Sequence, residues 1–179
     1  MEKIVGMVER CILKWQDNPG LLKYILGIYF FVCGQKRAAE AVEFTISLVS
    51  DMNGKYLWTA KKAVVAGLVC AKIGKQPQLY WSAPSAQAFV ILLLQATRVR
   101  AEYNEHLWFF TECALRCAVA ARDASLLPDV LELLNALNDG RMSPCPEMDL
   151  FDATVAQPGM LIMATSVLQK IAAEKSPKN

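Results

Sequence analysis

Residues 21–52 read LLKYILGIYFFVCGQKRAAEAVEFTISLVSDM and predict two helices folded back on each other about one tight turn. The first half is apolar on nearly every side, so we expect neighbours to cover it on more than one face. Gly34 should end this helix, and apolar positions then recur at helical spacing from Ala38 to Met52. Such an αα-hairpin cannot bury its surface alone and needs similar units stacked beside it.

The composition is apolar for a chain of this length. Of 179 residues, 54% are hydrophobic and 20% are charged, whereas hydrophobic residues make up roughly 45–50% of an average soluble domain. Either a partner chain or larger complex covers part of the surface, or the chain has an Ala- and Leu-rich helical core. Both interpretations stay open at this point.

Membrane insertion and secretion are not expected. The longest apolar run, from Tyr24 to Cys33, is ten residues, and a membrane-spanning helix needs about 20. The first ten residues, MEKIVGMVER, resemble neither a transit peptide nor a signal peptide. The six cysteines form no CxxC pair, so reduced thiols that serve as small core residues are favoured over a disulfide scaffold.

Charge is distributed unevenly along the chain. Residues 1–100 hold 13 basic and 6 acidic side chains, and residues 101–179 hold 6 basic and 11 acidic ones. No acid occurs between Met52 and Ala101, against seven basic residues. This basic stretch favours an acidic protein surface or a phosphate backbone as its partner, unless its lysines are simply solvated on exposed helix faces.

Every segment between Pro and Gly breaks has helical length and period, and none alternates like a strand. The sequence therefore predicts an all-α chain, a short right-handed α-solenoid of stacked αα-hairpins with eight or nine helices. We expect a single helical-repeat domain over residues 1–175 and a frayed tail over residues 176–179. The expected hairpins cover residues 21–52, 56–97, 102–138 and an irregular C-terminal pair, 147–173.

An insertion between two predicted helices gives the candidate partner site. Residues 77–84 begin and end with proline and hold Leu79, Tyr80 and Trp81 at their centre. These three side chains either fold back onto the helices or dock into a partner as interface anchors. We take Lys75, Leu79, Tyr80 and Trp81 as the candidate protein-binding residues.

Catalytic and metal-binding patterns are weak. His106, Cys113 and Cys117 lie on one side of a predicted helix, but residues two turns apart are about 10 Å apart along the axis, too far for one zinc ion. The stretch GLVCAKIGKQ, residues 67–76, differs from a phosphate-binding loop in glycine spacing and ends in Gln76 where Ser or Thr should bind magnesium. We expect no enzyme activity, no cofactor and no metal site.

The segment YILGIYFFVCGQKRAAEAVEFTISLVSDM, residues 24–52, resembles a pentatricopeptide or tetratricopeptide repeat hairpin. The resemblance implies an α-solenoid whose concave face holds RNA or a protein segment. RNA-reading members carry a small polar residue where this chain has Ile25 and Val64, so binding of nucleic acid is not expected. The implied function is a non-catalytic scaffold or accessory subunit that binds protein subunits of a larger complex.

The resemblance also implies a cellular localisation for the protein. One pentatricopeptide-like accessory subunit of similar size attaches to the outside of the catalytic head of a mitochondrial ATP synthase, and a resemblance to it implies the mitochondrial matrix. Otherwise we expect the cytoplasm. An RNA-binding organellar pentatricopeptide protein and a tetratricopeptide-like chaperone of type III secretion remain the alternatives.

Overall fold

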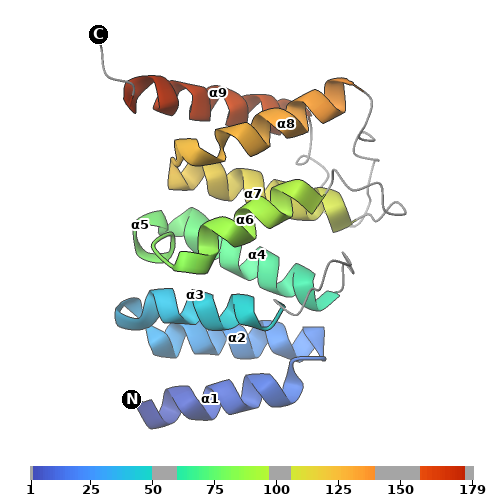
Figure 1. The fold of residues 1–179 in the computed structure, drawn as a ribbon. Helices are drawn as coiled ribbons and strands as arrows, with labels where there is room; N and C mark the ends of the chain where they lie inside the picture. The colour runs from blue at the N-terminus through green and yellow to red at the C-terminus, as the bar shows by residue number, and fades with distance from the viewer. Residues whose placement is uncertain (1, 50–59, 97–105, 140–157, 176–179) are drawn as a thin grey trace. The chain divides into compact units, whose positions relative to one another are not determined.

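The computed structural model describes residues 2–49, 60–96, 106–139 and 158–175 (Figure 1). In these four ranges the chain forms nine α-helices and two short 3-10 helices, and no strand. The α-helices are α1 (Glu2–Trp15), α2 (Pro19–Cys33), α3 (Ala38–Ser47), α4 (Ala60–Lys75), α5 (Pro77–Tyr80), α6 (Pro84–Ala96), α7 (His106–Ala121), α8 (Leu127–Asn138) and α9 (Pro158–Lys175). The predicted all-α class with eight or nine helices is confirmed, and neighbouring helices pack as stacked hairpins require. The right-handed twist of the stack remains a prediction.

The chain divides into two compact units, residues 1–89 and residues 90–179. In the first unit, α2 packs against α1, α3 and α4, and α5 packs against α3 and α4. In the second unit, α7 and α8 both pack against α9. The prediction of one domain over residues 1–175 stays a prediction.

The ends of α2 follow from local chemistry. Asn18 caps its N-terminus, because its side-chain oxygen accepts the Leu21 N–H at 3.1 Å, and Pro19 occupies the first turn, where its missing N–H is no loss. Gly34 ends the helix with φ of 56°, a left-handed conformation that glycine adopts without strain. The predicted turn at Gly34 is therefore confirmed, and the 3-10 turn Gln35–Arg37 leads into α3.

The core of the first unit centres on the aromatic residues of α2. Tyr29 and Phe30 are 1% and 2% exposed. The Tyr29 ring lies 5.1 Å from the Phe44 ring of α3, and the Phe30 ring lies 5.8 Å from the Tyr80 ring of α5. Contacts of this kind add to the free energy gained from apolar burial. Through them α2 joins α3 and α5 in one core.

The second unit has its own core on the inner faces of α7, α8 and α9. Its largest fully buried side chains include Phe110, Leu115, Leu133 and Leu161. Of the cysteines in the described part of the chain, Cys117 is fully buried, and all five are free thiols. Cys145 lies outside the described residues.

Two local sequence predictions need correction, and three others lie outside the described ranges. Gly74 predicts the end of a helix at that position, but α4 runs on to Lys75. The insertion over residues 77–84, flanked by prolines, predicts a loop, but α5 forms within it. The helix predicted over residues 147–156, the turn over residues 53–54 and the tail over residues 176–179 fall outside the described residues.

Candidate protein-binding surface

The four residues of the predicted partner site lie around α5. Lys75 is exposed, and Leu79 and Trp81 are half-buried. Tyr80 is only 6% exposed and packs edge to face on Phe30. Burial raises the pKa of the Tyr80 phenol, and the nearby Cys33 thiol adds to the effect. Tyr80 thus belongs to the core, while the assignment of the four residues to a partner surface stays a prediction.

The far end of this segment is fixed by α3. The Ser85 N–H in the first turn of α6 donates to the Glu43 Oε1 atom at 2.7 Å. A carboxylate at a helix N-terminus also interacts favourably with the helix dipole. Ser85, directly after Pro84, is a residue type that is expected to cap a helix, but here the capping oxygen comes from Glu43. The segment between α4 and α6 is therefore held at Tyr80 and again at Ser85.

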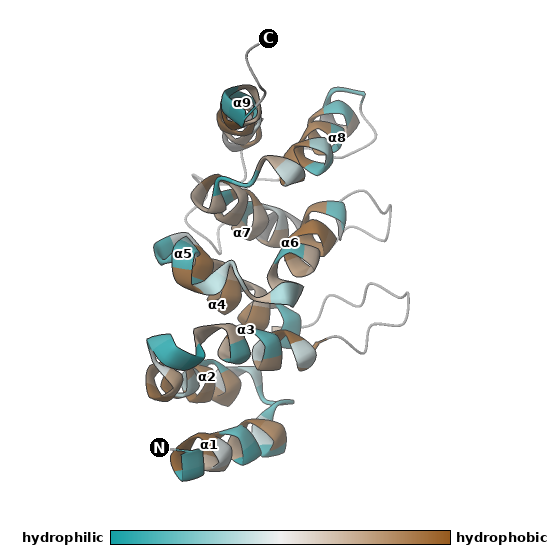
Figure 2. Cartoon of the chain, turned by 60° about the vertical axis from the view of Figure 1, so that its left-hand side comes forward, coloured by the Kyte–Doolittle hydropathy of each residue, from teal (hydrophilic) through white to brown (hydrophobic). Residues whose placement is uncertain are grey.

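A row of large apolar side chains lies on the outer side of α2. Leu21, Tyr24, Ile28 and Phe31 follow one another at spacings of three and four residues, so they share one helix face. Phe31 is 85% exposed, Tyr24 72% and Ile28 54%. In Figure 2, α2 is brown along most of its visible side. The sequence predicts that neighbours cover α2 on more than one face, and α1, α3 and α4 do so, but this outer side remains exposed to solvent.

Helix α1 carries a second exposed row. Ile4, Met7, Cys11 and Trp15 again follow at spacings of three and four residues, and all four are exposed. Lys14 lies in the last turn of α1, and its Nζ atom lies 5.4 Å from the Trp15 ring centre. A cation over an indole ring is attracted by the negative face of the ring.

The two rows lie on one side of the α1–α2 pair. The short turn over residues 16–18 makes the helices antiparallel, and Val5 and Ile12 of α1 are buried. Viewed from its own N-terminus, each helix carries its exposed row about a quarter turn away from the face that packs on the other helix, and the direction of this turn is the same in both helices. Two antiparallel helices are related by a twofold axis perpendicular to the plane that contains both helix axes. Equal displacements therefore bring both rows to the same side of that plane.

We name this surface the α1–α2 apolar face. It comprises Ile4, Met7, Cys11, Trp15, Leu21, Tyr24, Ile28 and Phe31. From their exposed fractions, Trp15, Tyr24 and Phe31 alone expose on the order of 400 Å². One patch of a few hundred Å² is about the largest that a monomeric protein usually exposes, and such patches mark interaction sites. The size of this face thus favours an interface.

A basic row borders the face on the outer edge of α1. Lys3, Arg10 and Lys14 are exposed and lie at helical spacing beside Met7. No acidic side chain stands in this row. The Glu9 carboxylate turns instead toward α2 and accepts a hydrogen bond there. The α1–α2 apolar face is therefore positive along one edge.

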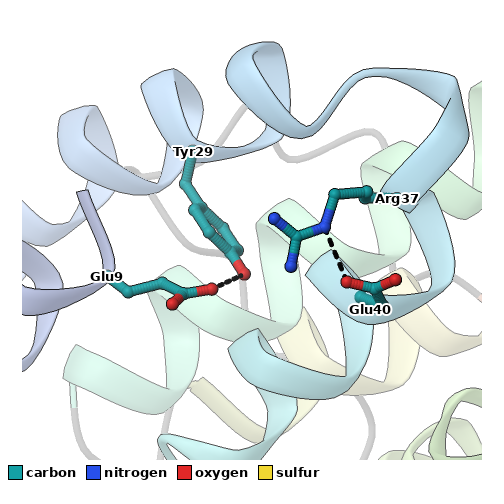
Figure 3. A network of polar contacts seen from close by, with 4 residues as sticks. All are labelled: Glu9, Tyr29, Arg37 and Glu40. Carbon is teal, nitrogen blue, oxygen red and sulfur yellow. Dashed lines mark hydrogen bonds and ion pairs between the residues drawn. The ribbon is translucent and has the colours of Figure 1, made fainter. Parts of the chain in front are cut away.

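A hydrogen bond joins the two helices that build the face (Figure 3). The Tyr29 hydroxyl of α2 donates to the Glu9 Oε1 atom of α1 at 2.8 Å. The second pair in this view, Arg37 with Glu40 at 2.7 Å, is local to the turn and the start of α3. Burial, and then the bond to Glu9, raises the pKa of Tyr29 far above its ordinary value. The phenol thus stays neutral and donates at any physiological pH, which fixes α1 on α2.

Two thiols among the described residues, Cys33 and Cys113, are held in the protonated form. Burial raises the pKa of Cys33, and burial raises the pKa of Cys113 to about 12. A thiol with a raised pKa is protonated at neutral pH and is a poor nucleophile. Among the side chains that the structure describes, no cluster of three or more His, Cys, Asp or Glu residues could hold a metal ion.

The described helices also bear on the membrane question and on relatedness. None of them is long and apolar enough to cross a bilayer. Comparison with known proteins returns no matching family model, curated protein or solved structure. The assignment of a function therefore depends on the surface itself.

Sequence reasoning missed the α1–α2 apolar face, although its signal was present. The apolar character of α2 predicts neighbours on more than one face, and α1, α3 and α4 provide them. The residues from Leu21 to Phe31 have the spacing of one helix face, but helical period alone does not tell which apolar row a neighbour covers. The sequence of α1 has apolar residues at the same spacing of three and four, from Ile4 to Trp15. The two helices considered together indicate a shared surface.

Proposed function

We propose that this protein is a non-catalytic scaffold or accessory subunit that binds a protein partner within a larger complex. The α1–α2 apolar face is the observation that carries the proposal. Its aromatic side chains are of the types enriched at interface hot spots, and its apolar area in water costs free energy until a partner covers it.

The finer form of the proposal follows the repeat resemblance of residues 24–52. The partner would be the catalytic head of a mitochondrial ATP synthase, with the protein attached at its periphery in the matrix. Only the hairpin resemblance supports this identity. Association with the subunits of that enzyme in a mitochondrial extract is its direct test.

Binding of RNA is the second function to consider, and Lys61 and Lys62 of α4 argue against it. Lys61 donates to Gln16 at 2.7 Å and lies 3.7 Å from Asp17, so a protein carboxylate already partly neutralises it. Lys62 is buried, and this burial lowers its pKa. Neither side chain is well placed for a phosphate backbone, which is bound by exposed cations.

Purification of the tagged full-length protein from its native source at moderate salt tests the proposal. We expect a fixed set of protein subunits with the wild type, and their loss with the double variant Tyr24→Ser/Phe31→Ser. The matched control is Ile162→Ser/Met163→Ser on α9, which also removes exposed apolar side chains. Equal recovery of the subunits with both double variants would refute a role for the face, and RNA in place of protein subunits would favour the second function.

A further inference from the structure

We propose that the α1–α2 apolar face binds an amphipathic helix of the partner that carries acidic residues along one edge. This inference rests on the proposed function and adds the shape and charge of the partner segment. Three observations support it: the arrangement of the two rows, the basic edge and the fixed geometry of the helices.

The two rows form a seam that suits a helix. Half-buried Val8, Ile25 and Val32 lie between the α1 row and the α2 row and make a floor between them. The α2 row from Leu21 to Phe31 covers ten steps, or about 15 Å at 1.5 Å per residue. A partner helix of about three turns has the same length, and its i, i+3 or i+4, and i+7 side chains would fit along this seam.

The basic edge selects the charge of the occupant. Lys3, Arg10 and Lys14 all border the α1 side of the face. A helix lying in the seam would place one flank along these cations, so acidic residues on that flank are favoured and basic ones are repelled. Because Lys14 already stacks on Trp15, its ammonium group is held at this edge.

Charge also argues against a second copy of this chain in the same position. From Glu2 to Arg37 the sequence holds six basic and three acidic residues, a net charge of +3. Two α1–α2 faces packed on each other would bring two positive surfaces together, which is unfavourable at an interface. A partner of opposite charge avoids that repulsion.

The face is formed before the partner arrives. Tyr29 and Glu9 hold α1 against α2, and the core side of α2 is fully packed. The exposed aromatic side chains have few rotatable bonds. Docking therefore orders little of this protein, and the main conformational cost falls on the partner helix.

The probes are two synthetic helices of about 18 residues with the same leucine row, one with glutamates and one with lysines along the adjoining edge. Binding of each to the full-length protein is measured by fluorescence anisotropy at physiological ionic strength. We expect the glutamate helix to bind at least about tenfold more tightly than the lysine helix. Replacement of Lys3, Arg10 and Lys14 by Glu should reverse this preference, and Tyr24→Ala/Phe31→Ala should weaken the binding of both helices. The Ile162→Ala/Met163→Ala protein should bind like the wild type.

Equal binding of the two helices, or binding that Tyr24→Ala/Phe31→Ala leaves unchanged, would overturn the inference. Sedimentation that shows a dimer lost in the same double variant would assign the face to a second copy. Flotation with vesicles containing phosphatidylserine, lost in the double variant without selective helix binding, would assign it to a membrane surface. If native subunits require the face but neither helix binds, the helix inference fails and the proposed function stands. If native subunits are recovered without need of the face, the face has no role in binding them. If no protein subunits are recovered at all, the proposed function itself fails.

Discussion

Helices α2 and α9 bury one side equally well but differ on the other. In α9, Leu161 and Leu168 are fully buried, as Leu22 and Leu26 are in α2. The outward positions of α9 beyond its first turns are polar: Ser166, Gln169, Lys170 and Glu174. The outward positions of α2 are almost all apolar. A helix of this chain can thus contribute a full core row without an apolar outer side, so the outer row of α2 needs another explanation.

The exposed hydrophobic side chains are distributed accordingly. Ten large ones are exposed among the residues that the structure describes, and eight of them belong to α1 and α2. The other two, Ile162 and Met163, lie next to each other on α9 and form no longer row. The first unit therefore presents an extended apolar surface and the described part of the second unit does not.

The largest expected effect separates the two sides of α2 at adjacent residues. Phe30 is 2% exposed and Phe31 is 85% exposed. Phe30→Ala should lower the free energy of unfolding by about 3–5 kcal/mol because it leaves a cavity in the core. Phe31→Ala should change it by less than about 0.5 kcal/mol, as surface substitutions usually do. Chemical denaturation of both variants measures the difference, and a large loss in Phe31→Ala would mean that the outer row belongs to the core.

A smaller effect is expected around α5. Tyr80→Ala removes a buried ring that packs on Phe30, so it should cost roughly 3 kcal/mol of stability. Trp81→Ala removes a half-buried side chain and should cost only about 1 kcal/mol, while weakening association with the partner if the sequence-based site is correct. Thermal unfolding and partner binding are measured on the same preparations. Unaltered binding with a large loss of stability in Trp81→Ala would place Trp81 in the core.

The bond between α1 and α2 should appear as a pH effect. The folded state keeps the Tyr29 phenol protonated, whereas in the unfolded chain it ionises near its ordinary pKa of 10.0. Its contribution is complete below that pH and is lost as the pH rises further, because the folded state then binds more protons than the unfolded state. Stability should fall by up to about 1.4 kcal/mol per pH unit for this group.

Tyr29→Phe should make that decline shallower, and it should also cost about 1–2 kcal/mol at neutral pH because the bond to Glu9 is lost. Tyr80, whose pKa is also raised, should preserve part of the decline. The exposed Tyr24→Phe variant is the matched control. A Tyr29→Phe protein with the wild-type pH dependence would show that this phenol does not couple α1 to α2.

Much of the fold was predictable because its signals are local. The turn at Gly34 follows from a glycine at the end of an apolar run, and the start of α8 at Leu127 agrees with Pro128, a residue that suits the first turn of a helix. Helix α5 was not predicted, since four residues between prolines carry no period. The buried position of Tyr80 depends on Phe30, which is 50 positions earlier in the chain. Contacts so distant in sequence leave no local pattern.

The binding surface was less predictable than the fold for a related reason. Apolar residues around all of α2 indicate burial, but only the packed structure tells that α1, α3 and α4 leave the side of Phe31 uncovered. The predicted site over residues 75–81 relied on aromatic residues in an insertion, and one of them, Tyr80, was taken up by the core. In both cases the burial of a side chain depended on which helix packs beside it and not on the type of residue.

Site-specific photocrosslinking in the native complex tests the central claim most directly. A photoreactive amino acid replaces Ile28 in one protein and Ile162 in the other, two isoleucines with similar exposed fractions of 54% and 57%. We predict a crosslink from position 28 to one defined segment of a single partner protein, and none to that protein from position 162. A crosslink of equal yield from both positions, or from position 162 alone, would contradict the assignment of the α1–α2 apolar face as the partner-binding surface.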